Sequence, residues 1–362
     1  MRERGPQRVG AVLTRHIEAG TTPGGMGALV TPNGRAVSWV AGNHGYGDDD
    51  GRVRFDDLYD LASVTKVVAT ATLCACLVDG GRLDLDEPVS DTIPEVTADG
   101  RVTARALLSH CAGFPAHVHL YKRMIDREEV IRAVCTMDLE YEPHTQSVYS
   151  DMGYILLGEL LERATGQPLN ELFRDYVREP LGLHETVYAP GPSARDRIVP
   201  TELDQQWRGR LVHGEVHDEN ASVMRGVAPH AGLFATLKDV SSFAQLWLNE
   251  GFCRGKQFLS ASTVRRFRSP SSIVDGSTWG LGWDTVSPGG STSGVHFSSE
   301  SYGILGFTGT SIWVDPIDRL AIVLLTNRVH PTRENWGIKR LRPEFHDAVR
   351  ENVKTDDVKM GD

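Results

Sequence analysis

The order of hydrophobic and polar residues predicts a helix and a β-hairpin at the start of the chain. Residues 8–19 place their apolar side chains on one face of a helix. Two runs with strand character, 27–32 and 36–41, flank Asn33-Gly34. An Asn-Gly pair between such runs is a strong hairpin signal, because both residues tolerate the positive φ of a tight turn. The chain is therefore expected to begin with a helix that leads into a hairpin.

Helical patterns dominate the middle of the chain. The run 67–78 contains no charged residue, so a helix there is apolar on all sides and must be buried. We expect this helix to end at Asp79-Gly80-Gly81. Its twelve uncharged residues are fewer than the roughly 20 that cross a bilayer, so no membrane span is expected. Further helices are predicted at 103–109, 127–135, 152–165 and 238–249.

Strand patterns return near the C-terminal end, after a Gly/Ser-rich stretch. They lie near 301–306, 310–315 and 320–326. Strands at both ends of the chain, with helices between them, predict an antiparallel sheet flanked by helices, with a mostly helical region inserted. The expected fold class is therefore α/β in the broad sense, of the α+β type. We expect residues 1–85 together with 235–362 to form the sheet domain, residues 86–234 to form the helical domain, and the active site to lie between them.

Composition narrows the classes of function. The 362 residues are 40% hydrophobic and carry a net charge of −10, as in ordinary globular proteins. Basic residues form no stripe, which argues against nucleic acid or an anionic membrane surface as partner. Five cysteines are an odd number for a disulfide framework, and no apolar segment follows the basic residues at the start. These features favour a cytoplasmic protein, although a leader that had been removed would leave the same sequence.

Ser63 and Lys66 lie one helical turn apart, just before the apolar run. Residues i and i+3 share a helix face, so Lys66 can supply the base that a serine hydroxyl needs at neutral pH. Burial would lower the pKa of this lysine and favour the neutral amine. Backbone N–H groups at the helix start would also stabilise an oxyanion beside Ser63. The alternative is a capping serine beside a lysine that reaches solvent.

Two other segments carry candidate chemistry. Tyr149-Ser150-Asp151 precedes the helix predicted at 152–165, and an ammonium beside Tyr149 would favour the phenolate as a proton acceptor. The glycine-rich run 303–310 would let a substrate approach the backbone and supply a second oxyanion donor. Alternatively, Tyr149 packs in the core, Ser150 or Asp151 caps the helix, and the glycines mark a bulge.

These three segments resemble the motifs of the serine beta-lactamase and penicillin-binding-protein superfamily. The similarity is greatest to the class C beta-lactamase-like branch, which also contains esterases, D-amino-acid peptidases and a muramyl amidase. The matching segments are Ser63-Val64-Thr65-Lys66, Tyr149-Ser150-Asp151, 81–89, 107–115, 230–234 and 306–316. The resemblance implies that Ser63 is acylated, that Lys66 and Tyr149 share the base role, and that the strand through Gly306 and Phe307 aligns the acyl group. The backbone N–H groups of Ser63 and Phe307 would hold the oxyanion.

Two departures from the family pattern bear on the substrate. Ile304-Leu305 stands where the family usually has Lys-Thr or His-Thr, and Asp151 stands where lactamases of this branch carry Asn. A substrate carboxylate would meet an apolar side chain at Ile304, which disfavours beta-lactams and D-Ala-D-Ala peptides and favours a neutral ester. The expected substrate contacts are Asp151, Ile304, Gly306, Phe307 and Thr308.

The most favoured function is therefore a carboxylesterase-like serine hydrolase that forms an acyl-enzyme. Muramyl or D-peptide amidase and beta-lactamase activity remain alternatives, and 212–221 with 326–333 look most like the muramyl amidase subgroup. Arg328, Arg333 and nearby histidines could bind a sugar acid there, or could pair with carboxylates. A binding protein that has lost turnover is a further alternative, suggested by the missing residues before Gly306.

Metal chemistry is disfavoured by residue spacing. His117-Val118-His119 lacks a third ligand nearby, and Glu215 stands at the wrong position between His213 and His217 for a zinc-binding H-E-x-x-H motif. We expect no metal and no organic cofactor. The expected partner is a small-molecule ester, lactam or peptidoglycan-derived substrate, and the oligomeric state is left open.

Overall fold

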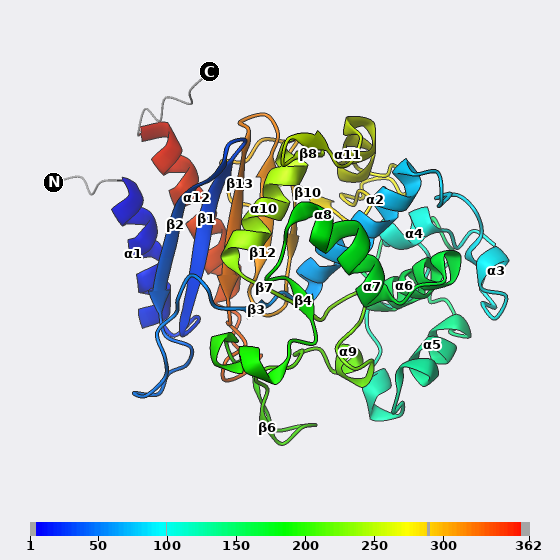
Figure 1. Cartoon of the computed structure of the whole chain (residues 1–362), viewed down its shortest axis with the longest axis horizontal. Helices are drawn as coiled ribbons and strands as arrows, with labels where there is room; N and C mark the ends of the chain where they lie inside the picture. The colour runs from blue at the N-terminus through cyan, green and yellow to red at the C-terminus, as the bar shows by residue number, and fades with distance from the viewer. Residues whose placement is uncertain (1–4, 99, 288–289, 356–362) are drawn as a thin grey trace.

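A six-stranded antiparallel sheet forms the centre of the protein (Figure 1). This computed structural model describes residues 5–98, 100–287 and 290–355. The strand order is β10-β11-β12-β13-β1-β2, so strands from both ends of the chain lie side by side. Its strands are β1 (Gly24–Thr31), β2 (Gly34–Gly42), β10 (Asp284–Thr285), β11 (Tyr302–Leu305), β12 (Ser311–Asp315) and β13 (Leu320–Thr326). The predicted antiparallel sheet built from both ends of the chain is confirmed.

The hairpin predicted around Asn33-Gly34 joins β1 to β2. Thr31 pairs with Gly34, and Gly34 has a φ of 120°, which a residue with a side chain rarely adopts. On its other edge β1 pairs with β13, where Ala28 lies opposite Val323. All seven residues of β13 are buried, because the strand is central and covered on both faces.

Helices cover both faces of the sheet, as the sequence predicts. Helices α1 (Gly5–Glu18) and α12 (Ile338–Thr355) pack on one face, and α10 (Leu237–Leu248) packs on the other (Figure 1). Alternate residues of β13 divide between two hydrophobic clusters, with Ile322 on the α1/α12 side and Val323 on the side of the other helices. This alternation follows from the two-residue period of a strand.

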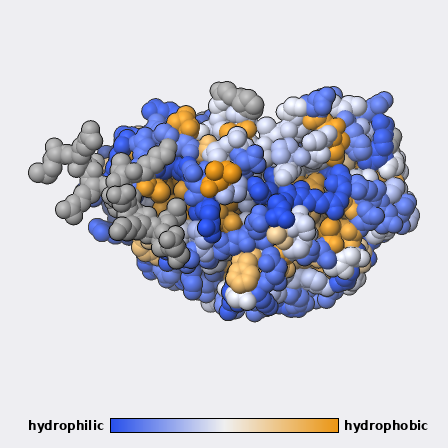
Figure 2. All heavy atoms as spheres, turned by 90° about the horizontal axis from the view of Figure 1, so that it is seen from above, coloured by the Kyte–Doolittle hydropathy of each residue, from blue (hydrophilic) through white to orange (hydrophobic). Residues whose placement is uncertain are grey.

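The helical region extends from the sheet as a continuation of the same hydrophobic core. The predicted helices at 103–109, 127–135, 152–165 and 238–249 are confirmed as α4, α5, α6 and α10. The α-helices of this region and its edge are α2 (Thr72–Asp79), α3 (Val89–Thr92), α4 (Ala104–Leu108), α5 (Arg127–Cys135), α6 (Asp151–Thr165), α7 (Leu169–Phe173), α8 (Glu179–Leu181), α9 (Glu219–Val223) and α11 (Ala261–Arg268). On the face seen in Figure 2, hydrophobic residues are scattered among hydrophilic ones.

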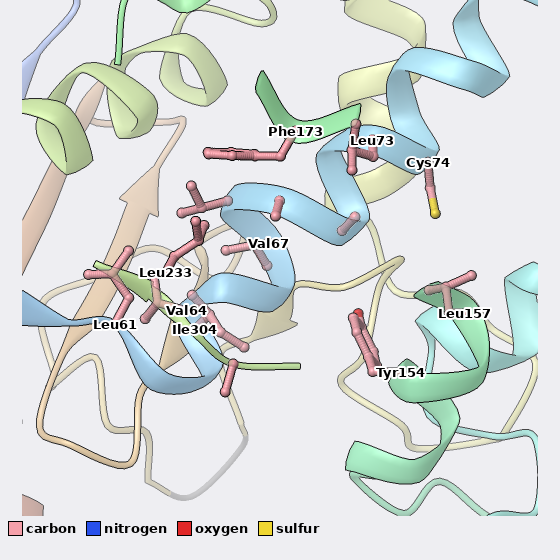
Figure 3. Close-up of a cluster of buried hydrophobic side chains, with 14 of the residues drawn as sticks. Leu61, Val64, Val67, Leu73, Cys74, Tyr154, Leu157, Phe173, Leu233 and Ile304 are labelled. Atoms are coloured by element: carbon pink, nitrogen blue, oxygen red, sulfur yellow. The ribbon is translucent and has the colours of Figure 1, made fainter. Parts of the chain in front are cut away.

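The predicted buried helix is longer than the uncharged run and is not uniformly α-helical. It begins as a 3₁₀ turn at Ala62–Val64, continues as a π-helical segment at Lys66–Ala71 and ends as α2. The stretch Ala62–Asp79 is long and apolar enough to span a membrane by length and composition, but 78% of it is buried inside the protein. Figure 3 shows Val64 and Val67 of this stretch among the buried side chains, beside Ile304.

A second, small sheet contains the strand that directly precedes this helical stretch in the sequence. It consists of β3 (Tyr59–Asp60), β7 (Leu233–Ala235) and β4 (Val187–Tyr188), in the order β3-β7-β4. Two short hairpins complete the strands: β5 (Leu203–Asp204) with β6 (Arg210–Leu211), and β8 (Phe252–Cys253) with β9 (Lys256–Gln257). The sequence patterns did not predict these two- and three-residue strands, because periodicity needs a longer run to be visible.

Candidate active site

Ser63 is presented by a strained turn at the end of β3. The Asp60 carboxylate accepts a hydrogen bond from the Ala62 N–H at 2.8 Å, and the Leu61 N–H donates to the Leu233 carbonyl at 2.9 Å. Between these two anchors, Ala62 adopts a φ of 46°, in the left-handed region. Such a conformation is costly for a residue with a Cβ and is concentrated at functional sites. The turn places Ser63, which is half-buried, at the start of the helical stretch.

Lys66 is completely buried and all three of its ammonium protons have acceptors. Its Nζ donates to Ser63 Oγ at 3.0 Å, to Asp151 Oδ1 at 2.7 Å and to the His230 carbonyl at 3.2 Å. The predicted proximity of Ser63 and Lys66 is thus present, and Asp151, from the start of α6, joins the pair.

The charge state of Lys66 differs from the sequence-based expectation. Burial alone would lower the pKa of this lysine, but Asp151 and Tyr149 outweigh that effect and raise its pKa above the ordinary value. The expectation of a neutral amine is therefore wrong. It considered only desolvation, whereas the fold brings a carboxylate from 85 positions away into contact with the ammonium.

Tyr149 lies against Lys66, with the Nζ atom 4.7 Å from the centre of its ring. Burial raises the pKa of the phenol; Lys66 and Ser63 oppose this, but the pKa stays above its ordinary value. The expectation that the ammonium would favour a phenolate is therefore also wrong, because desolvation is the larger effect. The ring packs on His110, at 4.6 Å between centroids, and His110 Nδ1 accepts the Ser150 N–H at 3.1 Å.

Asp151 connects this group to a second one that sequence reasoning missed. Its Oδ2 atom lies 3.1 Å from His117 Nδ1, and this hydrogen bond raises the pKa of His117. Burial alone would raise the pKa of Asp151, but Lys66, His117 and His230 hold it well below its usual range. Asp151 is therefore an anion between two cationic or potentially cationic partners. The sequence contained His117 but no signal that it would meet Asp151.

His117, Asp151 and Asp218 have ligand atoms within 4.8 Å of one another, a spacing at which a metal ion could be held. Both oxygens of Asp151 are already engaged, by Lys66 and by His117. A divalent ion on Asp151 would also stand beside the Lys66 ammonium, and like charges at this distance repel. The arrangement fits a network of hydrogen bonds better than a metal centre.

A cavity of about 740 Å³ opens beside Ser63. Of the expected site residues, Ser63, Tyr149, Asp151, Ile304, Gly306 and Phe307 line it. Thr308 is placed differently: it is buried and its hydroxyl donates to the Asp60 carbonyl at 2.7 Å, so it anchors the loop after β11. Gly306 is required sterically, since an added Cβ would lie 2.0 Å from Thr310 Oγ1.

The backbone of this cavity offers two unused donors. Within the ranges described by the structure, neither the Ser63 N–H nor the Phe307 N–H donates a hydrogen bond to another residue. Both residues line the same cavity. Two backbone N–H groups beside a serine hydroxyl are the arrangement that stabilises the oxyanion of acyl transfer.

The sequence left open whether Arg328 and Arg333 bind a substrate or pair with carboxylates, and the structure gives these two arginines different partners. Arg333 pairs with Glu202 and Glu219, each at 2.6 Å, as a residue paired with neighbouring carboxylates would. Among the residues that the structure describes, Arg328 donates hydrogen bonds to the backbone carbonyls of Phe307, Arg333 and Asn335 and to no side chain.

Ser63 accepts a hydrogen bond from a buried lysine and lies beside two N–H donors that have no acceptor among the described residues. This arrangement suits a serine hydrolase. The chain belongs to the beta-lactamase family, whose family model, described as Beta-lactamase, matches residues 13–342. This agrees with the resemblance of the sequence motifs, and both the fold class and the hydrolase assignment are confirmed.

Among curated relatives, the chain is 35% identical over 306 residues to an Escherichia coli O157:H7 protein provisionally named D-alanyl-D-alanine carboxypeptidase. The alignment covers 75% of this chain and 69% of that protein. Solved structures with the same fold include a penicillin-binding-protein homologue from Caulobacter crescentus, at 21% identity and a TM-score of 0.76, covering 96% of this chain and 98% of that one. A family VIII carboxylesterase is similar at 20% identity and a TM-score of 0.74, with 96% and 98% covered.

Proposed function

We propose that this protein is a carboxylesterase-like serine hydrolase in which Ser63 forms an acyl-enzyme. The observation that carries the proposal is the 3.0 Å hydrogen bond from Lys66 Nζ to Ser63 Oγ. It lies at a cavity where the N–H groups of Ser63 and Phe307 have no acceptor within the described part of the chain. A hydroxyl nucleophile, a proton acceptor and an oxyanion site are the three parts that acyl transfer needs.

The reaction proceeds in two steps. Ser63 Oγ forms a bond to the substrate carbonyl carbon while its proton passes to Lys66 or Tyr149, and the leaving alcohol takes a proton as its bond to carbon breaks. Water then attacks the acyl-enzyme, regenerates the Ser63 hydroxyl and releases the acid. Because the pKa values of Lys66 and Tyr149 are both raised, the fraction of unprotonated base, and with it the rate, increases towards alkaline pH.

A neutral ester is the substrate class that the cavity wall favours. Ile304 on β11 lines the cavity together with Ser63, and Leu305, Phe307 and Trp279 add apolar surface to it. A carboxylate placed against Ile304 would lose its hydration without gaining a donor. Substrates with an uncharged group at this position avoid that cost.

A D-peptide carboxypeptidase is the second candidate. The name of the Escherichia coli relative supports it, and Lys339 on the cavity wall is a specific observation in its favour. Lys339 lies over the Trp336 ring at 4.8 Å and forms no ion pair within the described residues. It could therefore receive a substrate carboxylate at the far side of the cavity.

Hydrolysis of p-nitrophenyl butyrate by the purified protein and by Ser63→Ala tests the proposal. We expect the variant to lose activity and to form no adduct with a fluorophosphonate when its mass is measured. Ser242→Ala, in which an exposed hydroxyl on α10 is removed, is the matched control and should remain active. Hydrolysis retained by Ser63→Ala would remove Ser63 from the mechanism.

The substrate class is tested with Ile304→His, which restores an imidazole at the family's usual position. This variant should hydrolyse carboxylate-bearing substrates, such as D-alanyl-D-alanine peptides, better than the original chain does. An unchanged preference, or efficient release of D-alanine by the original chain, would favour the carboxypeptidase.

A further inference from the structure

Two buried arginines donate hydrogen bonds to the backbone carbonyls of the loop after β11. Arg342, from α12, donates through Nη2 to the Gly306 carbonyl at 2.6 Å and to the Thr310 carbonyl at 2.9 Å. Arg328, just after β13, donates through Nε to the Phe307 carbonyl at 2.7 Å. The exposed fractions of these arginines are only 7% and 1%. Two cationic side chains thus contact consecutive peptide units of one loop.

Neither arginine has a carboxylate partner among the residues that the structure describes. Burial lowers the pKa of Arg342 to about 9, and the neighbouring charge of Arg328 adds to the effect. The Arg342 Nε–H has no acceptor in the described part of the structure. Burying a cation without a counter-ion costs free energy. Hydrophobic packing does not offset that cost, so a charged side chain at this position calls for another explanation.

The peptide unit that Arg342 contacts is the one that contains the free donor of the cavity. The Gly306 carbonyl and the Phe307 N–H belong to the same planar peptide group, and in a trans peptide they point in opposite directions. A guanidinium on the carbonyl side therefore leaves the N–H directed to the other side. Ser63, Gly306, Phe307 and Arg342 line one cavity, and the Phe307 N–H, which has no acceptor among the described residues, points to the side opposite the guanidinium.

A hydrogen bond to the carbonyl oxygen also changes the amide electronically. It increases the polarisation of the peptide group and makes the N–H a stronger donor, an effect of roughly 10–30% per bond. When the donor is charged, the hydrogen bond is about twice as strong as a neutral one. A cation that is hydrogen-bonded to the carbonyl oxygen therefore makes the N–H of the same peptide group a stronger hydrogen-bond donor.

We propose that Arg342 is a positioning residue that orients and polarises the Phe307 N–H as an oxyanion donor, while Arg328 holds the following peptide unit. This inference rests on the proposed function, because the Phe307 N–H has a catalytic role only if Ser63 is acylated. Although Arg342 also lines the cavity, the hydrogen bonds of its guanidinium go to the Gly306 and Thr310 carbonyls. It acts through the Gly306–Phe307 peptide.

The first test observes this peptide unit directly. Protein labelled with ¹³C at glycine carbonyls and ¹⁵N at phenylalanine amides gives NMR correlations only for Gly-Phe pairs, and the chain has three: Gly113-Phe114, Gly251-Phe252 and Gly306-Phe307. In Arg342→Gln the Gly306 carbonyl carbon and the Phe307 amide proton should both move upfield. The other two pairs should stay where they are and serve as internal references. Arg342→Lys, which keeps the charge, should give an intermediate shift.

The second test is kinetic. Removing an oxyanion donor costs about 10²- to 10³-fold in rate, so weakening one should lower kcat for p-nitrophenyl butyrate about tenfold with KM nearly unchanged. Arg342→Lys should recover part of kcat. Arg350→Gln is the matched control: it removes another buried arginine of α12, one that pairs with Asp315 at 3.2 Å and does not contact the loop. It should lower the melting temperature but leave kcat unchanged.

The outcomes separate the two proposals. A protein with no Ser63-dependent hydrolysis would refute the proposed function, whereas the NMR shifts would still decide whether Arg342 acts on the peptide. Unmoved Gly306-Phe307 signals in Arg342→Gln, or a loss of kcat no greater than in Arg350→Gln, would overturn the inference. If Arg342→Gln does not fold, the same two criteria are applied to Arg342→Lys.

Discussion

Replacing Asp151 with asparagine should move the pH dependence of hydrolysis to lower pH. The substitution keeps the size of the side chain and an oxygen that can accept from Lys66, but removes the negative charge. Asp151 raises the pKa of Lys66 and also that of Tyr149. The direction of the shift is therefore the same whichever of the two accepts the Ser63 proton.

The size of the shift follows from the geometry of the ion pair. Lys66 Nζ lies 2.7 Å from Asp151 Oδ1. Unit charges at that distance attract by about 6 kcal/mol at an effective dielectric constant of about 20. This sets an upper limit of about 4.5 units on the pKa change, at about 1.36 kcal/mol per unit. Because the amide oxygen retains a hydrogen bond, we expect the limb on which the rate rises with pH to move to lower pH by about 1–3 units.

The assay is kcat/KM for p-nitrophenyl butyrate, corrected for spontaneous hydrolysis, between about pH 6 and about pH 11, a range that approaches the raised pKa values of Lys66 and Tyr149 and includes the lower values expected of the variant. Asp218→Asn is the matched control. Its carboxylate lies within 4.8 Å of the Asp151–His117 group, yet it makes no hydrogen bond to Lys66. It should move the limb by less than Asp151→Asn does, because its carboxylate is not in contact with the ammonium. An Asp151→Asn limb that coincides with that of the original chain, or lies at higher pH, would refute the reasoning.

Two further predictions concern stability. Gly27→Ala should lower the free energy of unfolding by about 1–3 kcal/mol in urea titrations, because the new Cβ would lie 2.3 Å from Phe345 Cζ where α12 meets the sheet; no loss would mean that α12 can retreat freely. His346 is buried, and burial lowers its pKa to about 3. The unfolded chain therefore binds more protons below about pH 6.5, and stability falls as pH drops from there towards 3, by up to about 2 kcal/mol at pH 5. His346→Gln should lose less than the original chain between pH 7 and pH 5, and an equal loss would contradict the assignment.

The main elements of the fold could be predicted because their signals are local. Asn33-Gly34 specifies a hairpin whatever surrounds it, and the run 67–78 can only be buried. Helix α12 was not predicted, although α1 and α12 together cover one face of the sheet. Its Pro343 lies inside the helix and interrupts the usual helical signal, so tertiary packing rather than local preference places it there.

The sequence predicted Ser63, Lys66 and Tyr149 as a group, but it predicted neither the contact of His117 with Asp151 nor the charges of these side chains. The spacing of Ser63 and Lys66 and the position of Tyr149 follow from motifs along the chain. The protonation of Lys66 does not, because it depends on whether Asp151 and Tyr149 come within bonding distance in the folded state. A sequence identifies a buried lysine as costly, and only the three-dimensional structure shows which anion offsets that cost.

The two departures from the family pattern and the buried arginines together suggest how positive charge is used in this site. A cation on β11, at the position of Ile304, would contact the substrate throughout the reaction. It would therefore stabilise the bound substrate as well as the transition state. Arg342 also lines the cavity, but its guanidinium donates to the Gly306 carbonyl, on the side of the peptide opposite the Phe307 N–H. Through the Phe307 N–H its influence is greatest on the negative charge that develops in the transition state. Interactions that strengthen only there increase kcat, whereas those made equally with the substrate do not. In the proposed mechanism, this arrangement favours turnover of neutral esters over tight binding of carboxylates.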